Sequence, residues 1–231
     1  MSYTAFIFAR GGSKGILHKN IVPVAGKPLI AHSIVSALAS KSIAKVVVST
    51  DDKQIADVAK EYGAEVLKRP AELASDTSPE VLSWRHAIDN SQSEEQPFIS
   101  LPATSPLRAP QDIDAAIERY NKGDCDIVFG ISPAHRNPYL NMVTINENDL
   151  IEIAISGSSA VRRQDVPDMY DITTCVYVAR PDYVQTCNKL IDGRVGYVMI
   201  PPERALDIDT PFDLHMAELL LTTPYTAKTK G

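Results

Sequence analysis

A short basic and glycine-rich segment near the start of the chain has the composition of a polyphosphate-binding loop. An apolar run is followed by the segment Ala9, Arg10, Gly11, Gly12, Ser13, Lys14 and Gly15, and then by Lys19 and Asn20. Arg10, Lys14 and Lys19 thus bring three cations together within ten residues. Glycines let backbone N–H groups approach a phosphate closely, and the cations offset much of a triphosphate's charge. The spacing matches neither the P-loop of ATPases nor the dinucleotide fingerprint, so we expect a different nucleotide site; the alternative is a basic surface turn.

Two carboxylates near the other end of the chain have the spacing of a divalent-metal site. Asp207 and Asp209 are separated by Ile208 and precede Thr210 and Pro211, which suit the start of a helix. Side chains two residues apart on an extended segment point the same way, so both can reach one hard cation. Mg²⁺ is the expected occupant, with Mn²⁺ possible, and it would neutralise charge on a reacting phosphate. The alternative is that both acids cap the helix.

Short apolar runs rich in Val and Ile alternate with amphipathic segments along most of the chain. The runs predict strands at 4–9, 45–50, 65–68, 98–101, 126–132, 175–179 and 196–200, and the amphipathic segments predict helices at 28–40, 53–62, 79–90, 111–122 and 211–221. This alternation is typical of βαβ units. We therefore expect an α/β fold with a Rossmann-like, mainly parallel twisted sheet covered by helices on both faces. Ligands of such sheets bind at the carboxyl ends of the strands.

The stretch 135–171 breaks this alternation. Pro138, Gly157 and Pro167 surround two short apolar runs, at 142–145 and 150–155. We interpret it as an inserted, hairpin-like subdomain, which leaves 1–134 and 172–231 as the nucleotide-binding domain.

Composition excludes several classes of partner. Lys and Arg number 23 against 29 Asp and Glu, so the net charge of −6 gives no general attraction to nucleic acid or to an anionic membrane. Cys125, Cys175 and Cys187 are too far apart for a zinc site and odd in number for a disulfide framework. The first apolar run is too short for a signal segment or a membrane span. We expect a soluble protein of the cytoplasm.

The motifs together resemble those of a known family. The segment from Ala9 to Gly15, with Lys19 and Asn20, resembles the nucleotide-binding signature of the CMP-sialic acid synthetases, also called acylneuraminate cytidylyltransferases. The run from Asp207 to Thr210 resembles that family's metal-binding signature. Further matches follow three of the expected strands and extend the resemblance over nearly the whole chain, at 49–51, 69–78 and 104–108.

The resemblance implies an activity and roles for several residues. The family transfers CMP from CTP to the anomeric hydroxyl of a sialic-acid-like 2-keto sugar acid and releases pyrophosphate. By resemblance Arg10 and Lys14 hold the phosphates and act with Asp209 in catalysis, while Asp207 and Asp209 hold the metal. Asn20 is expected near the ribose or base, and further nucleotide contacts are expected from Arg69, Asp76, Thr77 and Ser78.

The resemblance also implies a homodimer and a sugar site. Arg163 and Gln164 match a segment of the family's dimerisation subdomain, where the arms of two subunits exchange and basic residues of one lie over the sugar site of the other. The planar guanidinium of arginine suits a sugar carboxylate. Thr104, Ser105 and Tyr177 are the other candidates for contact with the sugar. The alternative for the insertion is a solvated charged hairpin.

Two departures from the family pattern concern the sugar. Pro102 stands where relatives usually have glutamine, and Thr173 and Thr174 stand where they tend to have Asn-Gly. The identity of the acceptor therefore stays open. A cytidylyltransferase for 3-deoxy-octulosonate, a metal-dependent glycosyltransferase and a CTP-binding relative without activity are the alternatives.

Overall fold

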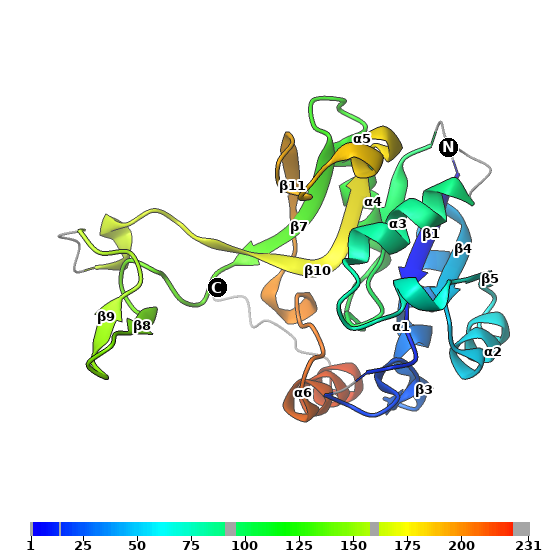
Figure 1. The fold of residues 1–231 in the computed structure, drawn as a ribbon, viewed down its shortest axis with the longest axis horizontal. Helices are drawn as coiled ribbons and strands as arrows, with labels where there is room; N and C mark the ends of the chain where they lie inside the picture. Colours follow the sequence, from blue (N-terminus) through cyan, green and yellow to red (C-terminus); the bar gives the residue numbers. More distant parts are fainter. Residues whose placement is uncertain (1, 14, 91–95, 158–161, 224–231) are drawn as a thin grey trace, which may run out of the picture.

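The main body of the protein is built on one sheet. In the computed structural model, which describes residues 2–13, 15–90, 96–157 and 162–223, this sheet has seven strands in the order β11-β7-β10-β6-β1-β4-β5 (Figure 1). Only β10 runs antiparallel to its neighbours in the described sheet. The strands are β1 (Tyr3–Phe8), β4 (Ile43–Thr50), β5 (Glu65–Lys68), β6 (Phe98–Ser100), β7 (Ile127–Pro133), β10 (Tyr170–Ala179) and β11 (Val195–Met199). The predicted, mainly parallel sheet is confirmed.

Helices cover both faces of the sheet, as predicted. Side chains of β4 alternate between the faces: Val46 and Val48 pack in the cluster that includes α1 (Leu29–Leu38), α2 (Lys53–Glu61) and α4 (Pro110–Tyr120). Val47 packs on the opposite face with α3 (Glu80–Asp89) and α5 (Pro181–Thr186). A strand buried on both faces needs apolar residues in continuous runs, which is why these strands are visible in the sequence.

Local signals set the helix ends. The Asp52 carboxylate accepts a hydrogen bond of 2.9 Å from the Ile55 amide at the start of α2, and Gly63 follows the helix with a φ of +90°. Thr210 and Asp213 form a capping box at the start of α6 (Pro211–Thr222). Several elements are too short to show a periodic pattern of apolar residues and were not predicted. They are α5, the strands β2 (Pro23–Val24) and β3 (Lys27–Pro28), and the 3₁₀ helices η1 (Lys19–Ile21), η2 (Ala71–Leu73), η3 (Arg163–Asp165) and η4 (Pro202–Arg204).

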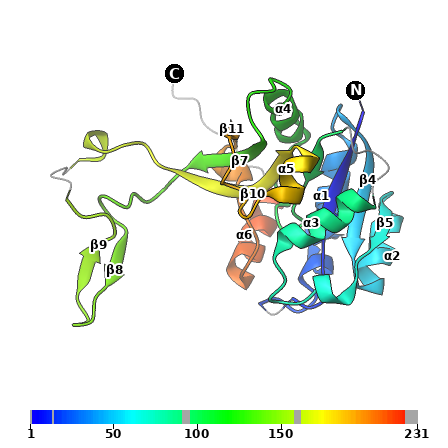
Figure 2. The same cartoon turned by 45° about the horizontal axis from the view of Figure 1, so that its top comes forward.

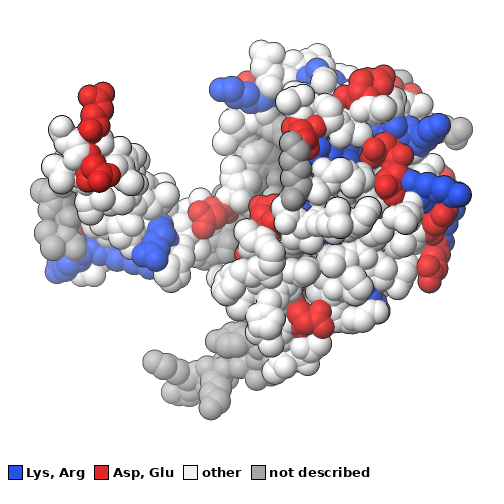
Figure 3. Space-filling view, turned by 60° about the horizontal axis from the view of Figure 1, so that its bottom comes forward, with Lys and Arg blue, Asp and Glu red and all other residues white. Residues whose placement is uncertain are grey.

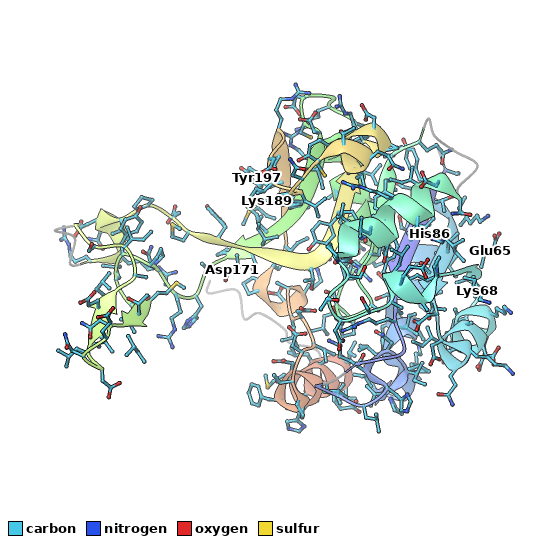
Figure 4. All side chains as sticks on the ribbon, viewed as in Figure 1. Glu65, Lys68, His86, Asp171, Lys189 and Tyr197 are labelled. Carbon is cyan, nitrogen blue, oxygen red and sulfur yellow. The ribbon has the colours of Figure 1, made fainter. Side chains whose placement is uncertain are left out.

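Residues 134–169, which we call the arm, extend away from the sheet (Figures 1 and 2). The neck of the arm is formed by the ends of β7 and β10, where Tyr170 pairs with Pro133 and Thr173 with Gly130. Asp171 lies on this neck, far from Glu65 and Lys68 on the edge strand β5 (Figure 4). The arm contains the antiparallel pair β8 (Val143–Ile145) and β9 (Ile151–Ile153). These two strands lie within the two apolar runs of the predicted insertion. Residues 158–161 of the insertion lie outside the described part of the chain.

The surface carries both signs of charge. On the face seen in Figure 3, Lys and Arg side chains of the main body are interspersed with Asp and Glu, and the arm stands apart from the main body. Within the described ranges, no helix is long and apolar enough to cross a membrane.

Candidate functional site

A cavity of about 440 Å³, which we call the central cavity, opens where β1, β5 and β6 end. Many of the predicted site residues line it, although they come from distant parts of the sequence: Arg10, Ser13, Gly15, Lys19, Asn20, Arg69, Asp76, Ser78, Thr104 and Asp209. Phe8, Leu73, Ser75, Glu80 and Ser83 complete the lining and were not predicted. Parallel strands bring the loops that follow them to one edge of the sheet, so the motifs after three strands meet there.

The glycine-rich loop approaches two acidic segments closely. The Gly11 amide donates to Asp51 Oδ1 at 3.1 Å, and a Cβ atom on Gly11 would lie 2.6 Å from Asp52 Oδ2. A Cβ on Gly15 would lie 3.0 Å from the Asp209 carbonyl oxygen. A side chain on Gly11 would therefore displace Asp52, and one on Gly15 would press on the backbone of Asp209, whereas a Cβ on Gly12 would meet no described atom within 4 Å. The predicted phosphate ligand Lys14 lies outside the described residues.

The cations of the loop are held by carboxylates that line the same cavity. Arg10 forms an ion pair with Asp76, and Lys19 Nζ lies 3.1 Å from Asp209 Oδ1 and 2.8 Å from the Ile208 carbonyl oxygen. The Asn20 side-chain amide donates to the Arg10 carbonyl oxygen at 3.0 Å. Exposed pairs of this kind are worth little in water, so an anionic ligand can replace the carboxylates at small cost.

Arg69 forms a fixed cationic wall of the cavity. Its guanidinium donates to Ser49 Oγ at 3.2 Å and to the Ser49 carbonyl oxygen at 2.6 Å, and it lies 5.5 Å from the centre of the Phe8 ring. Burial lowers the pKa of Arg69. An arginine remains protonated despite such a shift, so its positive charge persists at the ends of β4 and β5.

Asp207 and Asp209 flank a residue that anchors their segment. Ile208 is fully buried, while the Asp209 side chain is 73% exposed in the central cavity. Asp207 lines a second hollow with Thr173 and Thr174, and its Oδ1 is buried with no hydrogen-bond partner among the described residues. The buried Asp207 oxygen without a partner fits a hard cation such as Mg²⁺, which takes only a few protein ligands in addition to phosphate and water oxygens, although Asp207 and Asp209 line different hollows. In the described part, no group of three or more His, Cys, Asp or Glu side chains could hold a metal.

Glu80 is an acid of the cavity that the sequence analysis missed. It begins α3, lines the central cavity, and accepts a hydrogen bond of 3.2 Å from Trp84 Nε1. Desolvation raises the pKa of Glu80, opposed by the Trp84 bond and by the charge of Arg69. Tyr177 lies nearby with its ring 5.4 Å from that of Trp84, and burial, Glu80 and Asp207 raise the pKa of its phenol.

We expect Glu80→Gln to change how the stability of the nucleotide-free chain depends on pH. The folded chain holds the Glu80 proton more tightly than the unfolded chain, so stability falls as the pH rises from the unfolded pKa of about 4.3 to the raised folded pKa. Glutamine does not ionise and can still accept the Trp84 bond. The melting temperature of the variant should therefore exceed that of the wild type at about pH 8 and match it near pH 4.5. Equal differences at both values would contradict this expectation; Glu72→Gln, at an exposed position of η2, is the control.

The structure places several predicted residues away from the central cavity. Ala9 is buried and its amide donates to the Ser49 carbonyl oxygen at 3.1 Å. Ser105 is buried and its hydroxyl lies 3.1 Å from the carbonyl oxygen of Thr174. Thr77 is exposed, Tyr177 packs against the hydrophobic cluster that contains Trp84, and neither residue lines the cavity. The side chains of Ala9 and Ser105 thus hold the loops in place and do not line the central cavity.

The predicted sugar residues of the arm also lie apart from the cavity of the same chain. Arg163 Nη2 donates to the Ala134 carbonyl oxygen at 2.8 Å and lines a hollow at the base of the arm, with Gln164 beside it in η3. Their action at the sugar site of a partner subunit stays a prediction.

Comparison with known proteins identifies the family. The family model described as Cytidylyltransferase matches residues 4–186. The chain is 35% identical to the CMP-N,N'-diacetyllegionaminic acid synthase of Campylobacter jejuni, over 94% of this chain and 93% of that protein. It is 32% identical to N-acylneuraminate cytidylyltransferase A of Danio rerio, over 93% of this chain and 50% of that protein. A solved CMP:2-keto-3-deoxy-manno-octonic acid synthetase has the same fold, with a TM-score of 0.74 at 16% identity, over 96% of this chain and 99% of that chain. The chain therefore belongs to the cytidylyltransferase family, in the branch of the CMP-sialic acid synthetases.

Proposed function

We propose that this protein transfers CMP from CTP to the anomeric hydroxyl of a sialic-acid-like 2-keto sugar acid of the legionaminic acid class, with release of pyrophosphate. The observation that carries the proposal is the central cavity, in which the glycine-rich loop, Arg10 and Lys19 face Asp209. The names of the relatives, including the legionaminic acid synthase, support the choice of nucleotide and of acceptor class. The three cysteines are free and buried, which fits a reaction in a reducing cytoplasm.

The nucleotide half of the reaction follows from the charges of the cavity. The triphosphate lies along the glycine-rich loop, where Arg10 exchanges Asp76 for phosphate oxygens. Lys19 lies between Asp209 and the phosphates and holds both. Asp207 and Asp209 would hold Mg²⁺, which supplies neutralisation of the charge that develops on the phosphates.

The acceptor half requires a hydroxyl oxygen in line with the leaving group. The anomeric oxygen forms a bond to the α-phosphorus as the bond from that phosphorus to the α–β bridging oxygen breaks. The hydroxyl proton passes to Asp209 or to a water molecule, and pyrophosphate leaves with the bridging oxygen. We place the sugar acid on the side of the cavity that Thr104 lines and that borders Asp207, above Tyr177. Holding the two reactants in this geometry and stabilising the developing charge are the main contributions that a protein makes to phosphoryl transfer.

The proposal is tested by pyrophosphate release from CTP and Mg²⁺ with a panel of sugar acids. The panel contains N,N'-diacetyllegionaminate, N-acetylneuraminate, its deaminated analogue, pseudaminate and 3-deoxy-octulosonate. We expect the highest kcat/KM with the legionaminate. A higher value with 3-deoxy-octulosonate would contradict the acceptor class, and no release with any sugar acid would contradict the activity.

We further propose that the protein acts as a homodimer in which the arm packs against a second copy. Seven apolar side chains of the arm are exposed: Met142, Val143, Ile145, Leu150, Ile151, Ile153 and Ile155. The β8–β9 pair has only two strands and pairs Ile145 with Ile151 on its surface. Such a hairpin is marginally stable alone in water, so a covering surface is required. A second copy would cover it and would bring Arg163 and Gln164 toward a neighbouring central cavity.

The proposed dimer is tested by introducing two carboxylates on the β8–β9 hairpin. Ile145→Asp combined with Ile151→Asp should convert a dimer into a monomer in size-exclusion chromatography with light scattering, because carboxylates cannot be buried without partners. We expect the acceptor KM to rise at least about tenfold, since an arginine contact to a carboxylate is worth about 1.5–3 kcal/mol. Asn148→Asp at the exposed turn adds a charge without removing apolar surface and serves as control. A wild-type monomer would contradict the proposal.

A further inference from the structure

Glu80 differs from the other acids that line the central cavity because no cation of the described residues pairs with its carboxylate. Asp76 pairs with Arg10 and Asp209 pairs with Lys19, whereas no ion pair involves Glu80 within the described residues. Trp84 Nε1 binds Oε1 of Glu80, and the other carboxylate oxygen makes no hydrogen bond to the described part of the chain. Glu80 opens onto the central cavity, whose walls shield its carboxylate from bulk water. This oxygen is therefore available to a ligand group in the cavity that donates hydrogen bonds.

The position of Glu80 lies between the two ends of the nucleotide site. Its carboxylate interacts electrostatically with Arg69, at the ends of β4 and β5, and with Asp207, in the segment of residues 207–209. Lys19, whose Nζ lies 3.1 Å from Asp209 Oδ1, places phosphate oxygens near the segment of residues 207–209, while Arg10 extends from the glycine-rich loop to Asp76. The base must then extend toward Arg69, because the remaining lining of the cavity belongs to the segment that follows β5. The part of a nucleotide that joins base to phosphate is the ribose.

The chemistry of a carboxylate also selects the ribose. Phosphate oxygens would repel Glu80, as they carry the same sign of charge. The two ribose hydroxyls are neutral donors, and a carboxylate that accepts from ribose hydroxyls is a recurrent device of nucleotide-binding α/β folds. We propose that Glu80 accepts hydrogen bonds from the ribose hydroxyls of bound CTP and so selects ribonucleotides over deoxyribonucleotides. This inference rests on the proposed function, because it requires CTP in the central cavity.

The experiment compares kcat/KM for CTP, 2′-deoxy-CTP, 3′-deoxy-CTP and UTP in the wild type, Glu80→Met and Glu80→Gln, with Glu72→Met as control. Methionine keeps the length of the side chain but accepts no strong hydrogen bond. The wild type should prefer CTP to at least one deoxy analogue by about 10- to 100-fold, the value of a hydrogen bond to a charged group. In Glu80→Met this ratio should fall to about 1, while Glu72→Met keeps it. Glutamine retains one acceptor oxygen, so Glu80→Gln should keep an intermediate ratio and carries the test if Glu80→Met folds poorly.

Three results would overturn the assignment. If both variants keep the wild-type ratio of kcat/KM between CTP and the deoxy analogues, Glu80 does not contact the ribose. If the rate falls equally with every nucleotide, Glu80 has a role in proton transfer or in packing. A change confined to the ratio of CTP to UTP shows that Glu80 contacts the base. A wild type that uses no nucleotide triphosphate contradicts the proposed function itself, which separates that failure from the failure of this inference.

Discussion

Replacing Asp209 with asparagine is expected to lower the rate of pyrophosphate release by about a thousandfold, the upper range for loss of one charge-stabilising group in an active site. Asparagine keeps the size of the side chain and can still accept from Lys19, but it loses the negative charge that a divalent cation requires. Because the side chain is 73% exposed, the fold should be unaffected. The measurement is the rate at saturating CTP and sugar acid, together with the melting temperature.

The matched control for this substitution is Asp57→Asn, which removes the same charge from the exposed surface of α2. It should leave the rate within about twofold of the wild type, because Asp57 does not line the central cavity and salt screens exposed charges. Full activity of Asp209→Asn would contradict the metal-binding role of Asp209. A large fall in the melting temperature of Asp209→Asn would show instead that the segment of residues 207–209 supports the fold.

The substitution Arg108→Ala is expected to lower the free energy of unfolding by about 3 kcal/mol, since each buried acceptor left unpaired costs about 1–3 kcal/mol. Arg108 is buried, and its guanidinium donates to the carbonyl oxygens of Cys175, at 2.6 Å, and Pro102, at 3.2 Å. These bonds fasten the loop after β6 to β10 and so position Thr104 in the central cavity. Alanine removes the donors and leaves both carbonyls buried.

Thermal unfolding provides the readout for Arg108→Ala. For a chain of 231 residues we expect a fall in melting temperature of roughly 10 °C. Lys45→Ala, which breaks an exposed pair with Glu65, is the control and should cost less than about 1 kcal/mol. A melting temperature unchanged by Arg108→Ala would show that water or another side chain satisfies the two carbonyls, and that the loop does not depend on the arginine.

The fold could be predicted from the sequence because its strands are buried on both faces. Runs such as 45–50 lie within β4 of the structure, and the helix at 53–62 ends at Glu61, one residue earlier. The antiparallel direction of β10 could not be predicted, since the length of the arm decides how the chain returns to the sheet. α5 has six residues, which is too few to show a helical period.

The cavity was predicted at the level of loops but not of every side chain. Loops that follow parallel strands must meet at one edge, so Arg10, Arg69 and Thr104 were placed correctly. Ser105 belongs to the same run as Thr104, yet its side chain is buried against Thr174, because neighbouring residues of a loop point in different directions. Glu80 was missed because an acid in the first turn of a helix is favourable for the helix alone, which hides its exposure to the cavity.

The most direct test of the central claim follows the phosphorus atoms of CTP through one turnover with Mg²⁺ and N,N'-diacetyllegionaminate. In one reaction the α-phosphorus of CTP carries the label, and in a second the γ-phosphorus carries it. The account predicts that the α label appears in a CMP-linked sugar and the γ label in pyrophosphate, in equal amounts. Label from the α-phosphorus in free CMP or CDP, or γ label in inorganic phosphate without a sugar product, would contradict it.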